Sequence, residues 1–268
     1  MGSEVKHGGA VAEVAVIGGS GLYELFDGAE SVEVDTPFGP TSAPVTVGSI
    51  AGRQVAFVPR HGLNHEFPAH RVPYRANVWA LRQLGVHHVF APCASGSLTI
   101  DVAPGDFVVP DQLVDRTVGR PSTFYDGPTA FHVAFADPYC DPLRRLVVES
   151  CRAEGVVVHD GGTVVVVPGP RFSTRAESRW HAAMGATVVN MTQMPEAVLA
   201  AEAGMGYATI ALITDRDVGI AEGEEPITEG EVYARLKADV EKVRRVLLRA
   251  IAADLPTCVH EGGPAIDV

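Results

Sequence analysis

Short apolar runs rich in β-branched residues alternate with helical patterns along most of the chain. The runs occupy residues 14–17, 45–50, 55–58, 89–91, 107–109, 156–158, 163–167, 187–189 and 208–213. Apolar strands that alternate with helices are typical of a sheet covered by helices on both faces. No linker and no internal repeat divides the 268 residues. The pattern predicts a single α/β domain with a mixed β-sheet over residues 10–255, and disordered tails at residues 1–9 and 262–268.

Two helix starts carry a capping box, Thr174 with Glu177 and Thr228 with Glu231. After Thr228, apolar residues recur at spacings of three and four, which predicts an amphipathic helix lying on the sheet. These residues are Val232, Leu236, Val240, Val243, Leu247 and Ile251. Residues 45–50 and 55–58 predict a hairpin closed by Ala51 and Gly52.

Charge and hydropathy exclude several classes of partner. The net charge is −12 and no block of Lys or Arg is present, which argues against binding to nucleic acid or to an anionic membrane surface. No apolar run approaches the roughly 18 residues that a membrane span needs. The first residues carry no apolar segment typical of a signal peptide. We therefore expect a cytoplasmic protein without a nucleic-acid or membrane partner.

The four cysteines lie far apart and form no C-x-x-C pair. This pattern suits a reducing compartment and argues against a disulfide framework or a zinc ribbon. His61 and His65 are four residues apart, but the segment contains Gly62 and lacks a His-Glu-x-x-His motif, so a metal site is the weaker interpretation. We predict no metal and no cofactor.

A glycine turn, GGSGL, follows the first strand at residues 18–22. A dinucleotide-binding fingerprint would need glycine where Glu24 stands, and a nucleophile elbow would need it where Leu22 stands. The turn can still present backbone amides and the Ser20 hydroxyl to an anion. A plain tight turn is the alternative.

Two further segments carry groups that favour the binding of an anion. Arg60 offers a planar fork that matches phosphate oxygens, and the adjacent His61 can donate another hydrogen bond. Thr192 lies just before a helix opened by Pro195 and Glu196, and a helix N-terminus favours anion contact. An exposed Arg–His pair and ordinary helix-start residues are the alternatives.

Residues 93–97, CASGS, follow the strand at 89–91. Small residues at the carboxyl end of a strand let the backbone approach a ligand closely. Cys93 is better interpreted as a structural thiol than as a nucleophile.

Asp215 and Asp217 lie two residues apart at the end of the strand at 208–213, so on an extended segment both point the same way. Two acids this close disfavour being ionised together, which suits one as a proton donor and the other as an acceptor. A solvated acid pair on a loop is the alternative.

Taken together, these segments resemble the purine nucleoside phosphorylase and methylthioadenosine phosphorylase family. The resemblance covers nearly the whole chain, and the methylthioadenosine branch fits best because of FYDG, NMTxxPE and TDxD. Its ordered pieces are GGSGL (18–22), DTPFG (35–39), RHGLNH (60–65), YRANVWALRQLG (74–85), DQLVDRT (111–117), FYDG (124–127), PGPRFSTRAE (168–177), VNMTQMPE (189–196) and TDRD (214–217).

The resemblance implies a mixed, twisted sheet flanked by helices and a homotrimer in which a neighbouring subunit closes each 5′ pocket. Its implied phosphate-binding residues are Ser20, Arg60, His61, Cys93, Ala94 and Thr192. Its implied substrate-binding residues are Met191, Phe172, Asn190, His132, Ser173, Asp215 and Asp217. Among these, Asp217 lies at the purine N7, Asp215 at the 6-amino group, Phe172 against the base and His132 near the 5′ substituent.

The implied function is that of a pentosyltransferase in purine and methionine salvage. It cleaves 5′-methylthioadenosine with phosphate to adenine and 5-methylthioribose 1-phosphate, and Asp217 and Asp215 are the catalytic residues. Two departures from the family pattern stand out: Cys93 replaces a Thr beside the phosphate, and Glu229 stands where an apolar residue often lines the 5′ pocket. Phosphorolysis of adenosine or of purine nucleosides more broadly, and a nucleoside sensor without turnover, are the alternatives.

Overall fold

The computed structural model describes residues 11–19, 22, 29–221, 223, 226–258 and 262–264. The predicted site residue Ser20 lies outside these described residues. The described helices are η1 (Ala69–Arg71), α1 (Tyr74–Gln83), α2 (Asp141–Ala153), α3 (Arg175–Ala183), α4 (Gln193–Glu202) and α5 (Glu229–Ala252). The described strands are β1 (Val14–Gly18), β2 (Glu30–Val32), β3 (Val45–Ile50), β4 (Arg53–Pro59), β5 (His88–Ser97), β6 (Phe107–Val109), β7 (Gln112–Asp115), β8 (Val158–Asp160), β9 (Thr163–Val166), β10 (Val188–Asn190) and β11 (Gly206–Arg216).

Among the described residues, 11 strands form one mixed sheet. Its main path runs β2-β3-β4-β1-β5-β10-β9-β7, while β11 pairs with β5 and β6, and β6 with β8. The long strand β5 is central, because it is parallel to β1 and β11 and antiparallel to β10. The predicted single α/β domain with a mixed sheet flanked by helices is confirmed.

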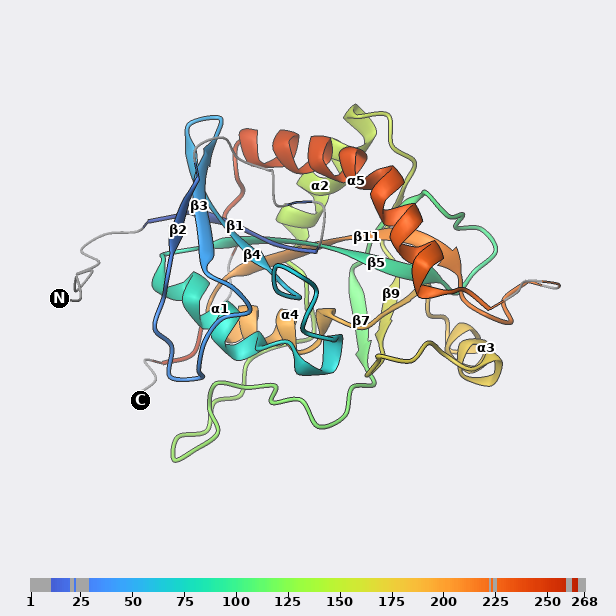
Figure 1. Ribbon diagram of the computed structural model, residues 1–268, viewed down its shortest axis with the longest axis horizontal. Coiled ribbons are helices and arrows are strands. Elements are labelled where there is room, and N and C mark those ends of the chain that lie inside the picture. Colours follow the sequence, from blue (N-terminus) through green and yellow to red (C-terminus); the bar gives the residue numbers. More distant parts are fainter. Residues whose placement is uncertain are drawn as a thin grey trace.

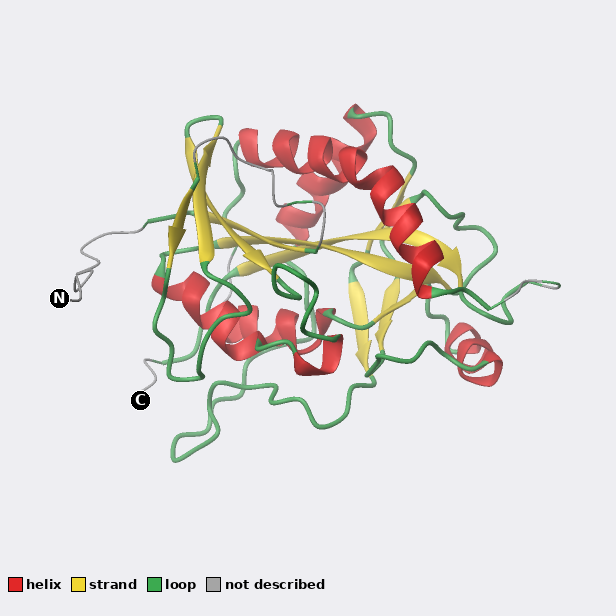
Figure 2. Ribbon diagram, in the orientation of Figure 1, coloured by secondary structure: helices red, strands yellow, loops and turns green. Residues whose placement is uncertain are grey.

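Helices cover both faces of the sheet (Figure 1). On one face α1 and α4 pack over β1, β4 and β5 through buried residues such as Val78, Leu81 and Leu199. On the other face α2 and α5 pack together over β11 through Val147, Leu247 and their neighbours. Figure 2 shows α3 apart from these two layers, beyond β9. The amphipathic pattern of residues 232–251 thus correctly predicts a helix on the sheet.

Both capping boxes form as predicted, with Thr174 Oγ1 accepting from Glu177 N at 3.2 Å and Thr228 Oγ1 from Glu231 N at 3.3 Å. The predicted hairpin is the antiparallel pair β3 and β4. Its turn residues Ala51 and Gly52 have φ of 51° and 80°.

Two strands extend further than the sequence predicts. The small residues 93–97 continue β5, and β11 runs on to Arg216, because these two strands pair in parallel over their whole length. Each strand supplies the backbone partners that the other needs, so low strand propensity is overridden. Within β11 the register shifts between Ile213 and Asp215, which leaves Thr214 as an extra residue beside the two carboxylates.

The expectation that the cysteines form no disulfide is wrong for one pair. Cys140, which precedes α2, is bonded to Cys258, beyond the end of α5, across 118 residues of sequence. The fold brings these two segments together, and sequence spacing alone carries no sign of that proximity. Cys93 and Cys151 are free.

Part of the expected C-terminal tail packs against the domain. Gly263 N donates to Glu202 O at 2.9 Å, and Tyr125 Oη donates to Pro264 O at 2.8 Å. Residues 263 and 264 therefore differ from the expectation of a disordered tail beginning at residue 262.

Candidate active site

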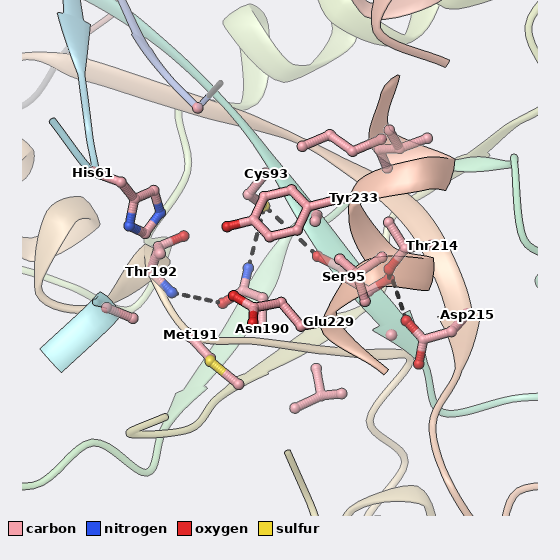
Figure 3. A pocket seen from close by; sticks show the side chains of 18 of the residues that line it. His61, Cys93, Ser95, Asn190, Met191, Thr192, Thr214, Asp215, Glu229 and Tyr233 are labelled. Atoms are coloured by element: carbon pink, nitrogen blue, oxygen red, sulfur yellow. Dashed lines mark hydrogen bonds between the residues drawn. The ribbon is translucent and has the colours of Figure 1, made fainter. Parts of the chain in front are cut away.

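A pocket of about 490 Å³ lies where β4, β10 and β11 end and the second half of β5 passes, under the first turns of α5 (Figure 3). Because these strand ends converge, most of the predicted site residues meet there. They are Arg60, His61, Cys93, Ala94, Phe172, Ser173, Asn190, Met191, Thr192, Asp215 and Asp217. His132 does not line the pocket of this chain and is exposed on the long loop before α2.

Arg60 is almost fully buried, at 2% exposure, and most N–H groups of its guanidinium already donate hydrogen bonds within the protein. Nε donates to Glu196 Oε2 at 2.8 Å and Nη2 to Glu196 Oε1 at 2.9 Å. Nη2 also donates to Ile17 O, and Nη1 donates to Pro92 O. The two-pronged face of the guanidinium therefore holds Glu196. One N–H of Nη1 is left for the pocket.

The ion pair also sets the charge at this end of the pocket. Burial on its own lowers the pKa of Arg60, but the attraction and hydrogen bonds of Glu196 outweigh burial and hold that pKa above its ordinary value. Arg60 therefore stays protonated at the pocket wall, with Glu196 as its counter-charge.

The surroundings of His61 favour its neutral form. Its Nδ1 lies 2.8 Å from Phe67 O, and because a carbonyl only accepts, Nδ1 carries the proton. Burial, and then the positive charge of Arg60, lower the pKa of His61 to about 4. Nε2 of the neutral ring is then an acceptor, so the expectation that His61 donates to phosphate does not hold for this state. Nε2 can instead accept from the hydroxyl of hydrogen phosphate.

Thr192 offers an unused hydroxyl. It caps the start of α4, is 7% exposed, and its Oγ1 is buried without a hydrogen-bond partner. Asn190 fixes this segment, because its Oδ1 accepts from Thr192 N at 3.4 Å and its Nδ2 donates to Cys93 Sγ at 3.3 Å. The side-chain amide of Asn190 is therefore used for positioning. Cys93 Sγ also lies 3.5 Å from Gln193 Nε2, which supports its interpretation as a structural thiol.

The carboxylates of Asp215 and Asp217 also line the pocket. Figure 3 shows Asp215 at the opposite end from His61 and Thr192. Asp215 Oδ1 accepts from Thr214 Oγ1 at 2.7 Å, and Asp217 Oδ2 from Ser178 Oγ at 2.8 Å. Gly96 lies against both acids, since a Cβ there would be 3.3 Å from Asp215 Oδ2 and 3.5 Å from Asp217 Cβ. Asp217 is buried at 4% exposure and Asp215 is half-buried. They are therefore not a solvated loop pair.

Further groups at this end can meet a flat ring. Ser173 Oγ is buried and has no hydrogen-bond partner, while the Phe172 ring lies at the pocket rim with 38% exposure. Met191 lines the pocket between the two ends, and its carbonyl accepts from Arg120 Nη1 at 2.8 Å. Arg120, which sequence reasoning missed, also donates to Pro168 O and so ties this wall together.

The start of α5 closes the pocket with a polar edge. Glu229 and Tyr233 line it together with His65, whose ring stacks on that of His61 with centroids 4.4 Å apart and meets Tyr233 edge-on at 5.5 Å. In Figure 3 Glu229 and Tyr233 lie between His61 and Asp215. The sequence flags Glu229 as a departure, whereas His65 and Tyr233 were not predicted as site residues.

Comparison with known proteins decides the family. A model described as the phosphorylase superfamily matches residues 13–252. The chain belongs to the phosphorylase superfamily. It is 54% identical to the S-methyl-5′-thioadenosine phosphorylase of Mycolicibacterium smegmatis, over 92% of this chain and 94% of that protein. It is 49% identical to the purine nucleoside phosphorylase of Streptomyces coelicolor, over 94% of this chain and 91% of that protein.

Solved phosphorylase structures share the fold. The methylthioadenosine phosphorylase from Schistosoma mansoni in complex with adenine superposes with a TM-score of 0.86 at 40% identity, covering 90% of this chain and 91% of that one. A methylthioadenosine phosphorylase from an antarctic soil metagenomic library superposes with a TM-score of 0.86 at 38% identity, covering 91% of this chain and 86% of that one. The family resemblance read from the sequence motifs is confirmed.

Two absences complete the description of the phosphorylase fold here. Within the described ranges, no cluster of three or more His, Cys, Asp or Glu side chains is arranged to hold a metal ion. None of the helices that the structure describes is long and apolar enough to cross a membrane.

Proposed function

We propose that this chain cleaves 5′-methylthioadenosine with inorganic phosphate and releases adenine and 5-methylthioribose 1-phosphate. The observation that carries this proposal is the pocket itself. One end holds a fixed cation and an unused hydroxyl, and the other holds two carboxylates. A nucleoside laid between them would have its sugar over the anion and its base at the acids. The names of the Mycolicibacterium and Schistosoma relatives support the same activity.

Phosphate would bind at the end formed by Arg60, His61 and Thr192. Arg60 contributes charge and one N–H, and Thr192 Oγ1 is a buried hydroxyl that needs a partner. The neutral His61 Nε2 would accept from the hydroxyl of hydrogen phosphate and so turn an unprotonated oxygen toward C1′. Ser20, Ala94 and the Cys93 segment would complete this site, with Cys93 replacing one hydroxyl contact by a thiol.

The base would lie at Asp215 and Asp217, with Phe172 against its face and Ser173 beside it. The backbone of Met191, between the two ends of the pocket, would meet the ribose. As the bond between C1′ and N9 breaks, phosphate would stabilise the cationic sugar, and Asp217 would supply a proton at N7. Asp215 would accept a hydrogen bond from the 6-amino group. This is catalysis by positioning and electrostatics, and no covalent intermediate, metal or cofactor takes part in it.

We extend the proposal to a cytoplasmic homotrimer. His132 is consistent with a trimer, because it does not line this chain's pocket and is exposed on the loop before α2. In that arrangement His132 of one chain would lie near the 5′ substituent in the next.

Adenosine is the second candidate substrate, and one observation favours it. The carboxylate of Glu229 and the phenol of Tyr233 both line the pocket. A 5′-hydroxyl can donate to Glu229, whereas a methylthio group cannot. The Streptomyces relative, named a purine nucleoside phosphorylase, is consistent with this candidate.

The test measures the release of free adenine from methylthioadenosine and from adenosine, each in the presence and in the absence of phosphate. Release that requires phosphate supports the proposal, and the ratio of the two rates separates the two candidates. Equal release in phosphate-free buffer would indicate a hydrolase. Tight nucleoside binding without adenine release would indicate the sensor alternative.

A further inference from the structure

The geometry around Asp217 points to Ser178 as a positioning residue whose hydroxyl keeps Asp217 aimed at the base both with and without its proton. Ser178 was not among the site residues predicted from the sequence. The inference rests on the proposed function, in which Asp217 supplies a proton to the purine N7.

Ser178 lies in the first turns of α3 and is fully buried, with 0% exposure. Its Oγ is 2.8 Å from Asp217 Oδ2 and 3.1 Å from Thr174 O. A hydroxyl has one proton, so it can donate to only one of these two acceptors at a time. Because Thr174 O has a second donor, the hydroxyl proton is available to Asp217.

Oδ2 of Asp217 can accept from Ser178 in both protonation states of the acid. When the carboxylate is ionised, Ser178 donates to it. When the carboxyl carries its proton on Oδ1, the oxygen left for N7, Oδ2 is its carbonyl oxygen and still accepts from Ser178. Thr174 O keeps a partner in either form, because Ser178 N donates to it at 3.0 Å. No buried polar group is stranded in either state, so neither carries the penalty of an unsatisfied group.

The charged groups near Asp217 are consistent with its role as a proton donor. Within the part of the chain that the structure describes, no Arg, Lys or His forms an ion pair with Asp217, and Ser178 is its side-chain hydrogen-bond partner. A paired cation would hold the carboxylate ionised and oppose proton donation, whereas a hydroxyl serves both states. Asp215 on β11 lies near Asp217, since both acids lie against Gly96. His181 lies one turn further along α3, and burial and then Arg116 lower its pKa, while Glu177 and Asp217 raise it.

The proposed reaction breaks one bond at C1′ and forms another there. The bond between C1′ and N9 breaks and its electron pair goes to the purine, while a phosphate oxygen forms the new bond to C1′. Asp217 gives its Oδ1 proton to N7 and becomes ionised, while Ser178 continues to donate to Oδ2. Hydrogen phosphate loses its proton to solvent in forming the ester, and Asp217 regains one from solvent after adenine leaves.

The test compares Ser178→Ala with Ser150→Ala. Ser150 is a matched control, because it is also a buried helical serine whose Oγ donates to the carbonyl four residues earlier, Leu146 O at 2.8 Å, but it lies outside the pocket. We expect Ser178→Ala to lower kcat by about 10- to 100-fold, the range for losing a hydrogen bond to a charged group, with KM changed by less than about threefold. Ser150→Ala should leave both constants unchanged.

A second readout separates positioning from folding. Adenine and 7-deazaadenine differ at N7, where the analogue has a C–H that neither accepts nor receives a proton. Ser178→Ala should weaken inhibition by adenine about tenfold or more while leaving inhibition by 7-deazaadenine within about twofold. If Ser178→Ala does not fold, Ser178→Cys, which keeps the size of the side chain with a weaker hydrogen bond, should show the same split.

Equal losses for adenine and its analogue, or kinetics of the Ser178 variant like those of Ser150→Ala, would overturn the inference. Either result with an active, phosphate-dependent wild type leaves the proposed function standing. A wild type without phosphate-dependent adenine release contradicts the proposed function itself.

Discussion

Arg60 and Glu196 form a two-pronged ion pair inside the protein, with Nε to Oε2 at 2.8 Å and Nη2 to Oε1 at 2.9 Å. Their side chains are 2% and 1% exposed. Tyr207 Oη adds a further bond to Glu196 Oε1 at 2.8 Å. The pair joins the end of β4 to α4 beneath the proposed phosphate position, so Glu196 holds the cation in place while Arg60 keeps one N–H for the ligand.

Removing the acid of this pair should destabilise the protein and weaken phosphate use. Glu196→Ala leaves a buried, uncompensated guanidinium, which costs about 3–5 kcal/mol of unfolding free energy. Chemical denaturation measures this loss, and the KM for phosphate should rise in parallel. The matched control is Glu154→Ala, which removes a partly exposed acid bound to Arg245 and Arg249. A Glu196 variant as stable as the Glu154 variant would contradict the importance of the buried pair.

Stability should fall as the pH drops from about 6.5 toward 4. The pKa of His61 is lowered from 6.5 to about 4 in the folded protein, first by burial and then by Arg60. Between these values the unfolded chain binds a proton that the folded chain does not, so acid favours unfolding. His61 alone accounts for at most about 3 kcal/mol, and His65 and His181, whose pKa values burial also lowers, act in the same direction.

Denaturant midpoints measured from pH 7.5 to pH 4.5 check this expectation. His61→Asn cannot titrate, so its stability should depend less steeply on pH than that of the wild type. A variant with an unchanged slope would show that His61 is not the neutral buried group described above.

The acid pair should make the enzyme prefer adenine nucleosides. An ionised Asp215 can accept from a 6-amino group, but the O6 of inosine would face it as a second acceptor in a partly desolvated site. We expect kcat/KM for inosine to be lower by several orders of magnitude, Asp215→Asn to relax that preference, and Asp217→Ala to abolish most turnover. Asp101→Asn, an exposed change outside the pocket, serves as the control. Inosine as the best substrate would show that the roles of the two acids are wrongly assigned.

Glu229 should tune the choice between the two candidate substrates. Glu229→Val removes a hydrogen-bond acceptor from the pocket wall, which disfavours a 5′-hydroxyl and favours a methylthio group. The ratio of kcat/KM for methylthioadenosine to that for adenosine should rise about tenfold, the value of one hydrogen bond. Glu241→Val, at an exposed position on the same helix, should not change this ratio. An unchanged ratio in the Glu229 variant would place the 5′ group elsewhere.

Local sequence patterns predict the elements whose signals are local. The capping boxes at Thr174 and Thr228 and the apolar spacing from Val232 to Ile251 depend on neighbouring residues, and the structure bears them out. Helix α2 was missed, although Leu143, Val147 and Cys151 recur every four residues. The extension of β5 through residues 93–97 depends on pairing with β11, more than 100 residues away, and local propensity does not show it.

For the site residues, too, the sequence shows the local motifs but not the contacts between distant residues. The motifs correctly gather Arg60, His61, Thr192, Asp215 and Asp217 into one pocket. They do not show what each side chain is already bonded to. Glu196 lies 136 residues from Arg60 in sequence, and its occupation of the guanidinium fork is visible only in three dimensions. The bond between Cys140 and Cys258 is hidden for the same reason.

The central claim is that the bond to the purine is cleaved by phosphate. Its most direct test is to incubate the protein with methylthioadenosine and a limiting amount of inorganic phosphate, and to measure phosphate consumed and adenine released in the same samples. The account predicts that one phosphate disappears for each adenine formed, and that release stops when phosphate is exhausted. Adenine formed without loss of phosphate would contradict it.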